Sequence, residues 1–230
     1  MKLKTSQYVL ICLILLAASY MLLAILRWWY ADAQFAKGKS LSDQGYVSDA
    51  LVYFQAAIKL MPGEPLFHNE LSDTAAKIAF GLTQQSATEA ARQATQLAIA
   101  ESDTTIALNQ VHLNFWKTRI RLWLILAQID PNFYTNAITD LKAALSLSPT
   151  DAKLMYNLGV LELQLGQPAT ARLTLEQTVV LKPNYEAARL ELGKLYQSIS
   201  EIALARQQYQ YILDHISPQN KTVLDLLNSL

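Results

Sequence analysis

The sequence predicts an all-α protein in which an apolar N-terminal helix precedes an α-solenoid of antiparallel helix pairs. Two observations support this prediction. Residues 8–26 form an apolar run without a charge. Farther along, Gly159 recurs as Gly193 and Pro149 recurs as Pro183, each 34 residues later. Similarity at a fixed period of this length indicates a helical repeat array, whereas an ordinary helical bundle does not repeat its glycines in this way.

The apolar run, YVLICLILLAASYMLLAIL, is long enough to cross a bilayer. Its nineteen residues would span about 28 Å as a helix, close to the thickness of the hydrocarbon core. Arg27 and a Trp-Trp-Tyr sequence follow, as at a lipid headgroup boundary. We therefore expect a short polar N-terminus (1–7) and a single transmembrane helix (8–30). The alternative is a signal peptide cleaved after the small-residue motif at 31–33, although such peptides usually have apolar regions of only about 7 to 15 residues.

Basic residues flank the apolar run on both sides. Lys2 and Lys4 precede it, and Arg27, Lys37 and Lys39 follow it. Because Lys and Arg are enriched on the cytoplasmic side of a membrane helix, this near balance gives only a slight preference. It favours a single-pass membrane protein with an inside N-terminus and its repeats on the extracytoplasmic side.

The unit at residues 152–185 shows how each helix pair is built. Gly166 is expected to end the first helix, because glycine adopts the left-handed conformation of a helix C-cap without penalty. Pro168 suits the first turn of the second helix. Gly159 allows the second helix to approach closely, with the small side chain of Ala171 expected opposite it.

This unit resembles the tetratricopeptide repeat (TPR). The TPR motif has a large residue, Leu-Gly, a small residue, an aromatic residue or Leu, a second small residue and Pro. These places are taken by Met155, Leu158, Gly159, Ala171, Leu175, Thr178 and Pro183. Thr178 is the mismatch. The resemblance implies stacked helix pairs whose first helices line a concave groove.

The same pattern divides residues 31–218 into five helix pairs. No glycine or proline occurs from residue 8 to residue 37, so we expect the membrane helix to continue into the first repeat helix without a break. The predicted pairs are 31–64, 65–110 (degenerate), 111–151 (with an insertion), 152–185 and 186–218.

Two pairs and the C-terminus depart from the simple pattern. In the second pair, helices are expected on either side of Gly81. In the third pair, about seven inserted residues around 128–134 separate the helices, and Asp130-Pro131 is expected to start the second one. An array needs a cover for its last apolar face, and residues 219–230 are predicted to form that capping helix.

Composition and motifs argue against several functions. The 19 basic and 19 acidic residues cancel, which gives no support for nucleic-acid binding. The lone Cys12 lies in the apolar run, where it has neither a disulfide partner nor a base. The sequence lacks phosphate-binding loops and nucleophile elbows, and His68, His112 and His215 fall in separate pairs without metal-ligand spacing. We therefore expect no enzymatic activity, no catalytic residue, no metal site and no cofactor.

The TPR resemblance places the binding groove at the second, fifth, ninth and twelfth positions of the first helices. These and neighbouring positions give the predicted partner-binding residues Lys117, Arg121, Lys153, Tyr156, Asn157, Leu190 and Lys194. A mixture of basic, aromatic and aliphatic side chains suits an extended acidic-hydrophobic peptide. The alternative is that these charges are simply solvated. Arg121 stands where the carboxylate clamp of TPR proteins has Asn.

A narrower resemblance covers residues 28–41 and 50–79. These segments are similar to the junction between the last membrane helix and the TPR tail of O-antigen ligase-like enzymes. A single membrane segment replaces the multi-helix core in which those enzymes transfer glycans. We therefore expect a membrane-anchored TPR scaffold for protein–protein interaction. The alternative is an accessory or regulatory component of an envelope polysaccharide assembly system.

Overall fold

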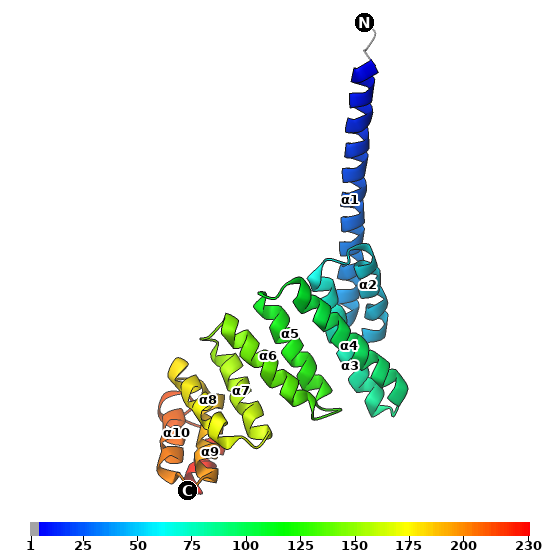
Figure 1. Ribbon diagram of the computed structural model, residues 1–230. Coiled ribbons are helices and arrows are strands. Elements are labelled where there is room, and N and C mark those ends of the chain that lie inside the picture. Colours follow the sequence, from blue (N-terminus) through cyan, green and yellow to red (C-terminus); the bar gives the residue numbers. More distant parts are fainter. Residues whose placement is uncertain (1–4) are drawn as a thin grey trace. The chain divides into compact units, whose positions relative to one another are not determined.

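The computed structural model describes residues 5–230, which form eleven α-helices and no strand (Figure 1). This arrangement confirms the all-α prediction. The chain divides after Gln110 into two compact units. Unit 1 contains α1 (Thr5–Asp43), α2 (Val47–Leu60), α3 (Pro65–Gln84) and α4 (Thr88–Leu108). Unit 2 contains α5 (Leu113–Leu126), α6 (Phe133–Leu147), α7 (Ala152–Gln164), α8 (Pro168–Leu181), α9 (Glu186–Ser198), α10 (Ile202–His215) and α11 (Lys221–Asn228).

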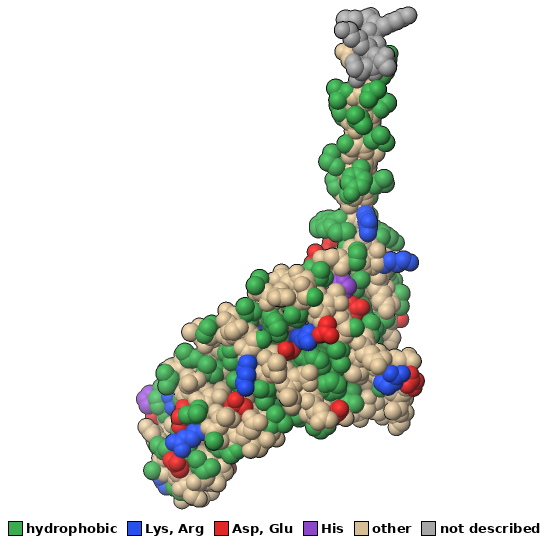
Figure 2. Space-filling model, in the orientation of Figure 1, with side chains coloured by type: hydrophobic (Ala, Val, Ile, Leu, Met, Phe, Trp, Pro, Cys, Tyr) green, Lys and Arg blue, Asp and Glu red, His purple; other side chains and the backbone are tan. Residues whose placement is uncertain are grey.

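The first helix, α1, is continuous from Thr5 to Asp43, as the absence of glycine and proline predicted. Within the predicted polar segment 1–7, residues 1–4 with Lys2 and Lys4 lie outside the described residues. Side chains from residue 7 to residue 30 are exposed, and Ala31 is the first fully buried one. Hydrophobic side chains cover this exposed stretch (Figure 2). By length and composition alone, α1 is the one helix in the described chain that could cross a membrane.

After Ala31, α1 becomes the first helix of a packed pair. The ring of Phe35 lies 4.8 Å from that of Phe67 and 5.7 Å from that of Phe54, measured between centroids. Ala31 itself packs with Ala57 and Phe67 in a buried cluster. One helix therefore presents a lipid-like apolar surface over its first half and a protein core over its second half.

A recurring glycine lets the two helices of a pair cross closely. In three pairs this glycine of the first helix lies under a large side chain sixteen residues later, and a Cβ at the glycine would overlap that side chain. The contacts are Gly38 with Phe54, Gly159 with Leu175, and Gly193 with Tyr209. The side chain that covers Gly159 is that of Leu175, and the expectation that Ala171 lies opposite this glycine stays a prediction.

Replacing Gly193 with Ala is expected to destabilise the protein. Overpacking against the Tyr209 ring costs about 1 to 3 kcal/mol, and the higher helix propensity of Ala returns about 1 kcal/mol. Gly81 is the matched control, because it lies inside α3 with nothing within 4 Å of its ideal Cβ. Gly81→Ala should therefore stabilise the protein by up to about 1 kcal/mol. Urea unfolding of the detergent-solubilised chain would contradict the packing argument if both variants shifted the midpoint upward.

In most pairs the turn between the two helices contains a residue with positive φ. In the second pair this turn lies later in the sequence than predicted. The helix expected to break near Gly81 continues to Gln84, and the reversal occurs at Ser86, with a φ of 60°. Ser200 plays the same part in the fifth pair, with a φ of 63°. Gly45 and Gly166 take this conformation in the first and fourth pairs, and for Gly166 it was predicted. The chain reverses where the pair geometry demands it, even where the residue is not glycine.

The third pair and the C-terminus also show how local contacts fix the ends of helices. Contrary to expectation, α6 begins at Phe133 and not at Asp130-Pro131, because Asp130 accepts a hydrogen bond from the Asn132 amide in a turn that precedes the helix. At the C-terminus, Val223 of α11 is completely buried in one core cluster with residues of α8, α9 and α10, as expected of a capping helix.

Thr178, the mismatch to the TPR motif, is accommodated in the core because its hydroxyl is hydrogen-bonded within α8. It is fully buried, and its hydroxyl donates to the Thr174 carbonyl oxygen at 2.8 Å. With its polar group satisfied inside the helix, a threonine can pack where the motif expects a small apolar residue.

Candidate functional site

A hollow of about 370 Å³ in unit 2 is the candidate site, and we call it the groove. It lies between the C-terminal end of α5, the start of α6 and one face of α7. Its walls are largely polar and aromatic. The lining residues are Leu124, Gln128, Tyr134, Tyr156, Asn157, Val160, Leu161 and Gln164.

The α7 wall of the groove follows from helical periodicity. Val160 follows Tyr156 by four residues and Asn157 by three, and Gln164 follows Val160 by four, so these residues share one face of α7. The opposite face of α7 carries core residues such as Leu158, which is 7% exposed. The amphipathic pattern that buries one face of the helix therefore presents the other to the groove.

The insertion in the third pair contributes a second tyrosine. Tyr134 lies in the first turn of α6, next to Phe133, whose ring stacks on that of Trp123 with centroids 5.5 Å apart. Asp140 fixes Trp123 in turn, because its Oδ2 accepts a hydrogen bond from Trp123 Nε1 at 2.5 Å and from Arg119 Nε at 2.8 Å. A polar clamp between α5 and α6 thus places the start of α6 beside the groove.

Tyr156 is half-buried and packs against Tyr185, the residue that precedes α9. Its ring centroid lies 5.1 Å from that of Tyr185. Burial, together with the negative charge of Glu191, raises the pKa of Tyr156 above its usual value. A tyrosine hydroxyl is protonated at neutral pH even at its usual pKa, so Tyr156 keeps a hydrogen-bond donor.

Lys117 is engaged with the protein itself. Its Nζ lies 2.7 Å from Asp151 Oδ2, and Asp151 caps α7 by accepting from the amides of Lys153 and Leu154. Partial burial acts to raise the pKa of Asp151, but hydrogen bonds from Lys117 and these amides outweigh it and lower that pKa. Lys117 therefore joins α5 to the start of α7.

The other predicted residues occupy different surroundings. Arg121 and Lys153 are exposed, Lys194 Nζ lies 2.8 Å from Glu191 Oε1, and Leu190 packs against the core of α8 to α11. Of the seven predicted binding residues, Tyr156 and Asn157 line the groove. The assignment of the remaining five to a binding surface stays a prediction.

Sequence reasoning overlooked three polar residues of the groove. Gln128 and Tyr134 belong to the segment assigned to the insertion, for which no binding role was predicted. Gln164 lies one turn beyond Val160 on the same face of α7. Extending the groove face by one turn at its C-terminal end would have found Gln164. No comparable signal in the sequence placed Tyr134.

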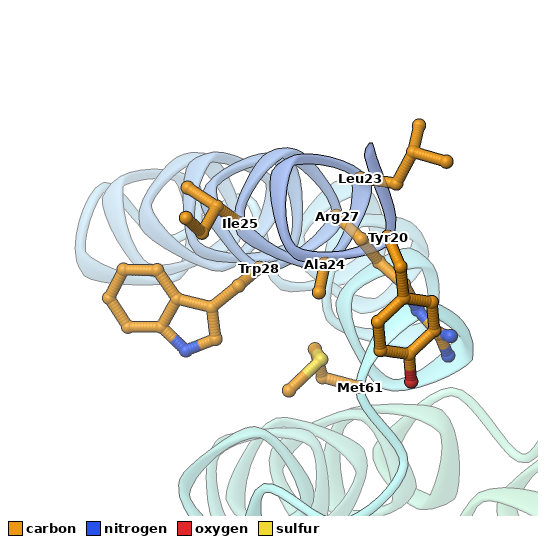
Figure 3. A pocket seen from close by; sticks show the side chains of 7 residues that line it. All are labelled: Tyr20, Leu23, Ala24, Ile25, Arg27, Trp28 and Met61. Carbon is orange, nitrogen blue, oxygen red and sulfur yellow. The ribbon is translucent and has the colours of Figure 1, made fainter. Parts of the chain in front are cut away.

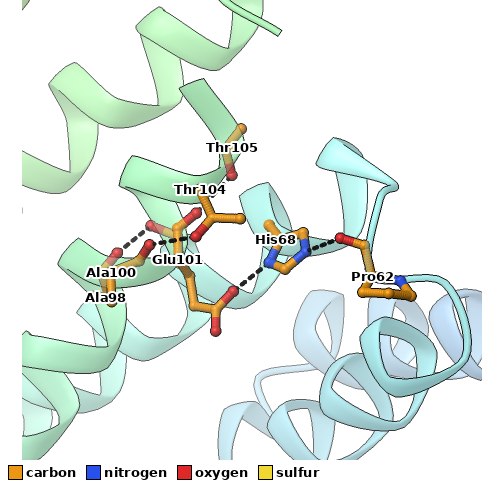
Figure 4. Close-up of polar contacts among 8 residues, drawn as sticks. Pro62, His68, Ala98, Ala100, Glu101, Thr104 and Thr105 are labelled. Atoms are coloured by element: carbon orange, nitrogen blue, oxygen red, sulfur yellow. Dashed lines mark hydrogen bonds and ion pairs between the residues drawn. The ribbon is translucent and has the colours of Figure 1, made fainter. Parts of the chain in front are cut away.

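The histidines serve structural contacts. His68 is buried, with Nδ1 2.5 Å from Glu101 Oε2 and Nε2 donating to the Pro62 carbonyl oxygen at 3.0 Å (Figure 4). These contacts tie α3 to α4 and to the turn before α3. His112 stacks on Phe115. Within the described residues, no cluster of three or more His, Cys, Asp or Glu side chains could hold a metal ion.

The antiparallel helix pairs define a helical repeat protein of TPR-like architecture. A sequence model of the tetratricopeptide repeat family matches residues 141–173. That match covers the second half of α6, all of α7 and the start of α8, and of these segments α7 forms one wall of the groove. No curated protein matches the sequence of the chain.

Several solved structures share the fold. Pseudomonas aeruginosa PilF is 22% identical with a TM-score of 0.60, over 86% of this chain and 81% of that one. MamA from Desulfovibrio magneticus RS-1 is 17% identical with a TM-score of 0.62, over 83% of this chain and 97% of that one. YrrB, described as a TPR protein with an unusual peptide-binding site, is 14% identical with a TM-score of 0.60, over 86% of this chain and 91% of that one. Identities this low establish the fold alone.

Proposed function

We propose that this protein is a membrane-anchored scaffold without catalysis of its own, and that it holds an extended acidic-hydrophobic segment of a partner protein in the groove. The composition of the groove is the observation that carries the proposal. Two tyrosines and three side-chain amides line the groove together with Leu124, Val160 and Leu161. YrrB, whose description names a peptide-binding site, shares the fold and supports a peptide as the ligand.

Each part of the groove suits one part of an extended peptide. The amides of Gln128, Asn157 and Gln164 both donate and accept hydrogen bonds, as the backbone of an extended chain requires. The rings of Tyr134 and Tyr156 offer large, rigid apolar surfaces with a polar tip, a combination common at binding hot spots.

The exposed cations indicate the end of the groove at which the acidic residues of the peptide bind. Arg121 precedes Leu124 by about one turn of α5, and Lys153 precedes Tyr156 by about one turn of α7. Both helices are the first of their pairs, so they run in the same direction. The two cations therefore flank the same end of the groove, where we expect the acidic residues of the partner.

Membrane anchoring through residues 8–30 completes the proposal. Cleavage after Ala33, the alternative, would cut inside α1 and remove Ala31, which is fully buried against Ala57 and Phe67. Losing a core residue of the first pair makes an uncleaved anchor the better explanation. We place the repeats on the extracytoplasmic side, and digestion of unit 2 by protease added only to the cytoplasmic face of membranes would contradict that orientation.

An accessory role in envelope polysaccharide assembly has weaker support. The segments that resemble O-antigen ligase-like proteins, 28–41 and 50–79, lie in α1, α2 and α3. Packing accounts for much of their pattern, because Gly38 lies under Phe54 and Phe35 stacks on Phe67. Copurification with a polytopic glycan ligase would favour this role over a scaffold for other proteins.

Photo-crosslinking in intact membranes tests the groove. A crosslinking amino acid in place of Val160, which lines the groove, should capture a partner segment that mass spectrometry identifies as acidic and apolar. The same amino acid in place of Leu173, an exposed residue of α8 outside the groove, is the control. Equal capture at both positions would contradict the assignment of the groove.

Variants then separate the two kinds of contact. Tyr156→Ala should weaken partner binding by tenfold or more at any salt concentration, since hot-spot truncations cost about 2 kcal/mol or more. Arg121→Glu with Lys153→Glu should weaken it mainly at low salt, because charges are screened over about 8 to 10 Å at ordinary ionic strength. Lys142→Glu, an exposed charge reversal on α6 outside the groove lining, is the matched control.

A further inference from the structure

The turn between α2 and α3 is fixed against α1 and α3 at two of its carbonyl groups. Arg27 Nε donates to the Leu60 carbonyl oxygen at 2.6 Å, and His68 Nε2 donates to the Pro62 carbonyl oxygen at 3.0 Å. Arg27 therefore caps the C-terminal end of α2, where carbonyl groups lack helical partners and a positive charge is favourable. Met61 lies between the two fixed carbonyls.

Met61 closes an open apolar hollow of about 660 Å³ against α1. The α1 side includes Tyr20, Leu23, Ala24 and Trp28. Figure 3 shows Met61 facing Ala24, between the side chains of Tyr20 and Trp28. The first three of these α1 residues belong to the uncharged run that ends at Leu26.

The position of the hollow along α1 matters because part of α1 is the proposed membrane span. Ala24 precedes Leu26 by two residues, or about 3 Å along the helix, and Tyr20 precedes it by six residues, or about 9 Å. A turn of the repeat region therefore reaches back alongside the apolar run. If residues 8–26 fill the hydrocarbon core, Met61 lies at its edge.

We propose that the α2–α3 turn is a second membrane contact, and that the hollow is filled by an acyl chain of a neighbouring phospholipid. This inference rests on the proposed membrane anchoring. An acyl chain matches the apolar wall formed by Leu23, Ala24 and Met61, which is continuous with the lipid-facing surface of α1. Arg27 and Trp28 lie at the outer end of the hollow, where a guanidinium and an indole suit the headgroup region.

The second contact would fix the orientation of unit 1 relative to the bilayer. A single helix passing into a repeat array can tilt and rotate in the membrane. Two contacts, α1 and the turn fixed by Arg27 and His68, define which side of the first helix pair faces the lipid. Unit 1 would then keep one orientation relative to the bilayer and would not rotate freely about α1.

Depth-dependent fluorescence quenching tests the proposal with the full chain. Single cysteines are introduced in a Cys12→Ala background, labelled with bimane, and reconstituted in phosphatidylcholine vesicles containing an acyl-chain nitroxide lipid. Met61→Cys is the test position, and Pro62→Cys in the same turn is a second probe. Leu16→Cys reports on the membrane span. Gln85→Cys, at the far end of the 20-residue α3, is the aqueous control about 30 Å away.

The expected result is quenching at positions 16 and 61, weaker quenching at position 62, and none at position 85. Quenching at position 16 without quenching at positions 61 and 62 would overturn the second contact and leave the anchor intact. The absence of quenching at position 16 would instead refute the anchor, and with it this inference. Far-UV circular dichroism checks that each labelled chain keeps its helical content.

Discussion

Placing arginines at both Leu15 and Leu16 is expected to release the protein from the membrane fraction. Both side chains are exposed, at 61% and 67%, and they lie near the centre of the uncharged run. Each arginine at the centre of a membrane helix costs about 2.5 to 3.5 kcal/mol of insertion free energy, so the pair costs about 5 to 7 kcal/mol. Carbonate extraction followed by immunoblotting of pellet and supernatant measures the outcome.

The control keeps the run apolar. Leu15→Ala with Leu16→Ala shortens the same two side chains without adding charge, and this variant should stay in the pellet. Because these residues touch no core residue of the repeat pairs, the arginine variant should keep its fold. Wild-type protein that carbonate extracts, or a mature N-terminus at Gln34, would show that residues 8–30 are not a retained anchor.

The sequence predicted the fold well where local chemistry decides the structure. Gly166 with Pro168 marked a helix end and the next helix start, and the structure places both as predicted. Ser86 and Ser200 were missed as turn residues because serine has no strong preference for positive φ. At those positions the packing of the two helices imposes a conformation that the residue type does not reveal.

The candidate site was predictable only in part, for a related reason. The resemblance to the TPR placed Tyr156 on the groove face with Asn157 beside it, and both residues line the groove. Periodicity says nothing about partners from another helix, so it could not show that Lys117 is paired with the cap of α7. Tyr134 depends on the stacking of Phe133 on Trp123, a contact that no spacing rule predicts.

Replacing Asp140 with Ala is expected to destabilise unit 2 more than any other single change proposed. Asp140 is 8% exposed and accepts hydrogen bonds from Arg119 and Trp123. Its removal leaves the nearly buried indole N–H without this acceptor and the guanidinium without this counter-charge. Breaking a buried ion pair from one side costs about 3 to 5 kcal/mol. Urea unfolding of the detergent-solubilised chain, followed by circular dichroism, measures the loss.

Two further variants separate the buried clamp from ordinary surface charge. Asp140→Asn keeps an acceptor for Trp123 and removes the negative charge, so it should be less damaging than Asp140→Ala. Glu89→Ala removes an exposed partner of Arg92 and should leave stability nearly unchanged. An unfolding midpoint for Asp140→Ala equal to that of Glu89→Ala would refute the structural role of the clamp.

The same variant connects the clamp to the groove. Trp123 stacks on Phe133, which precedes Tyr134 of the groove. Asp140→Ala should therefore also reduce crosslinking from position 160 in intact membranes, under conditions where the variant is still folded.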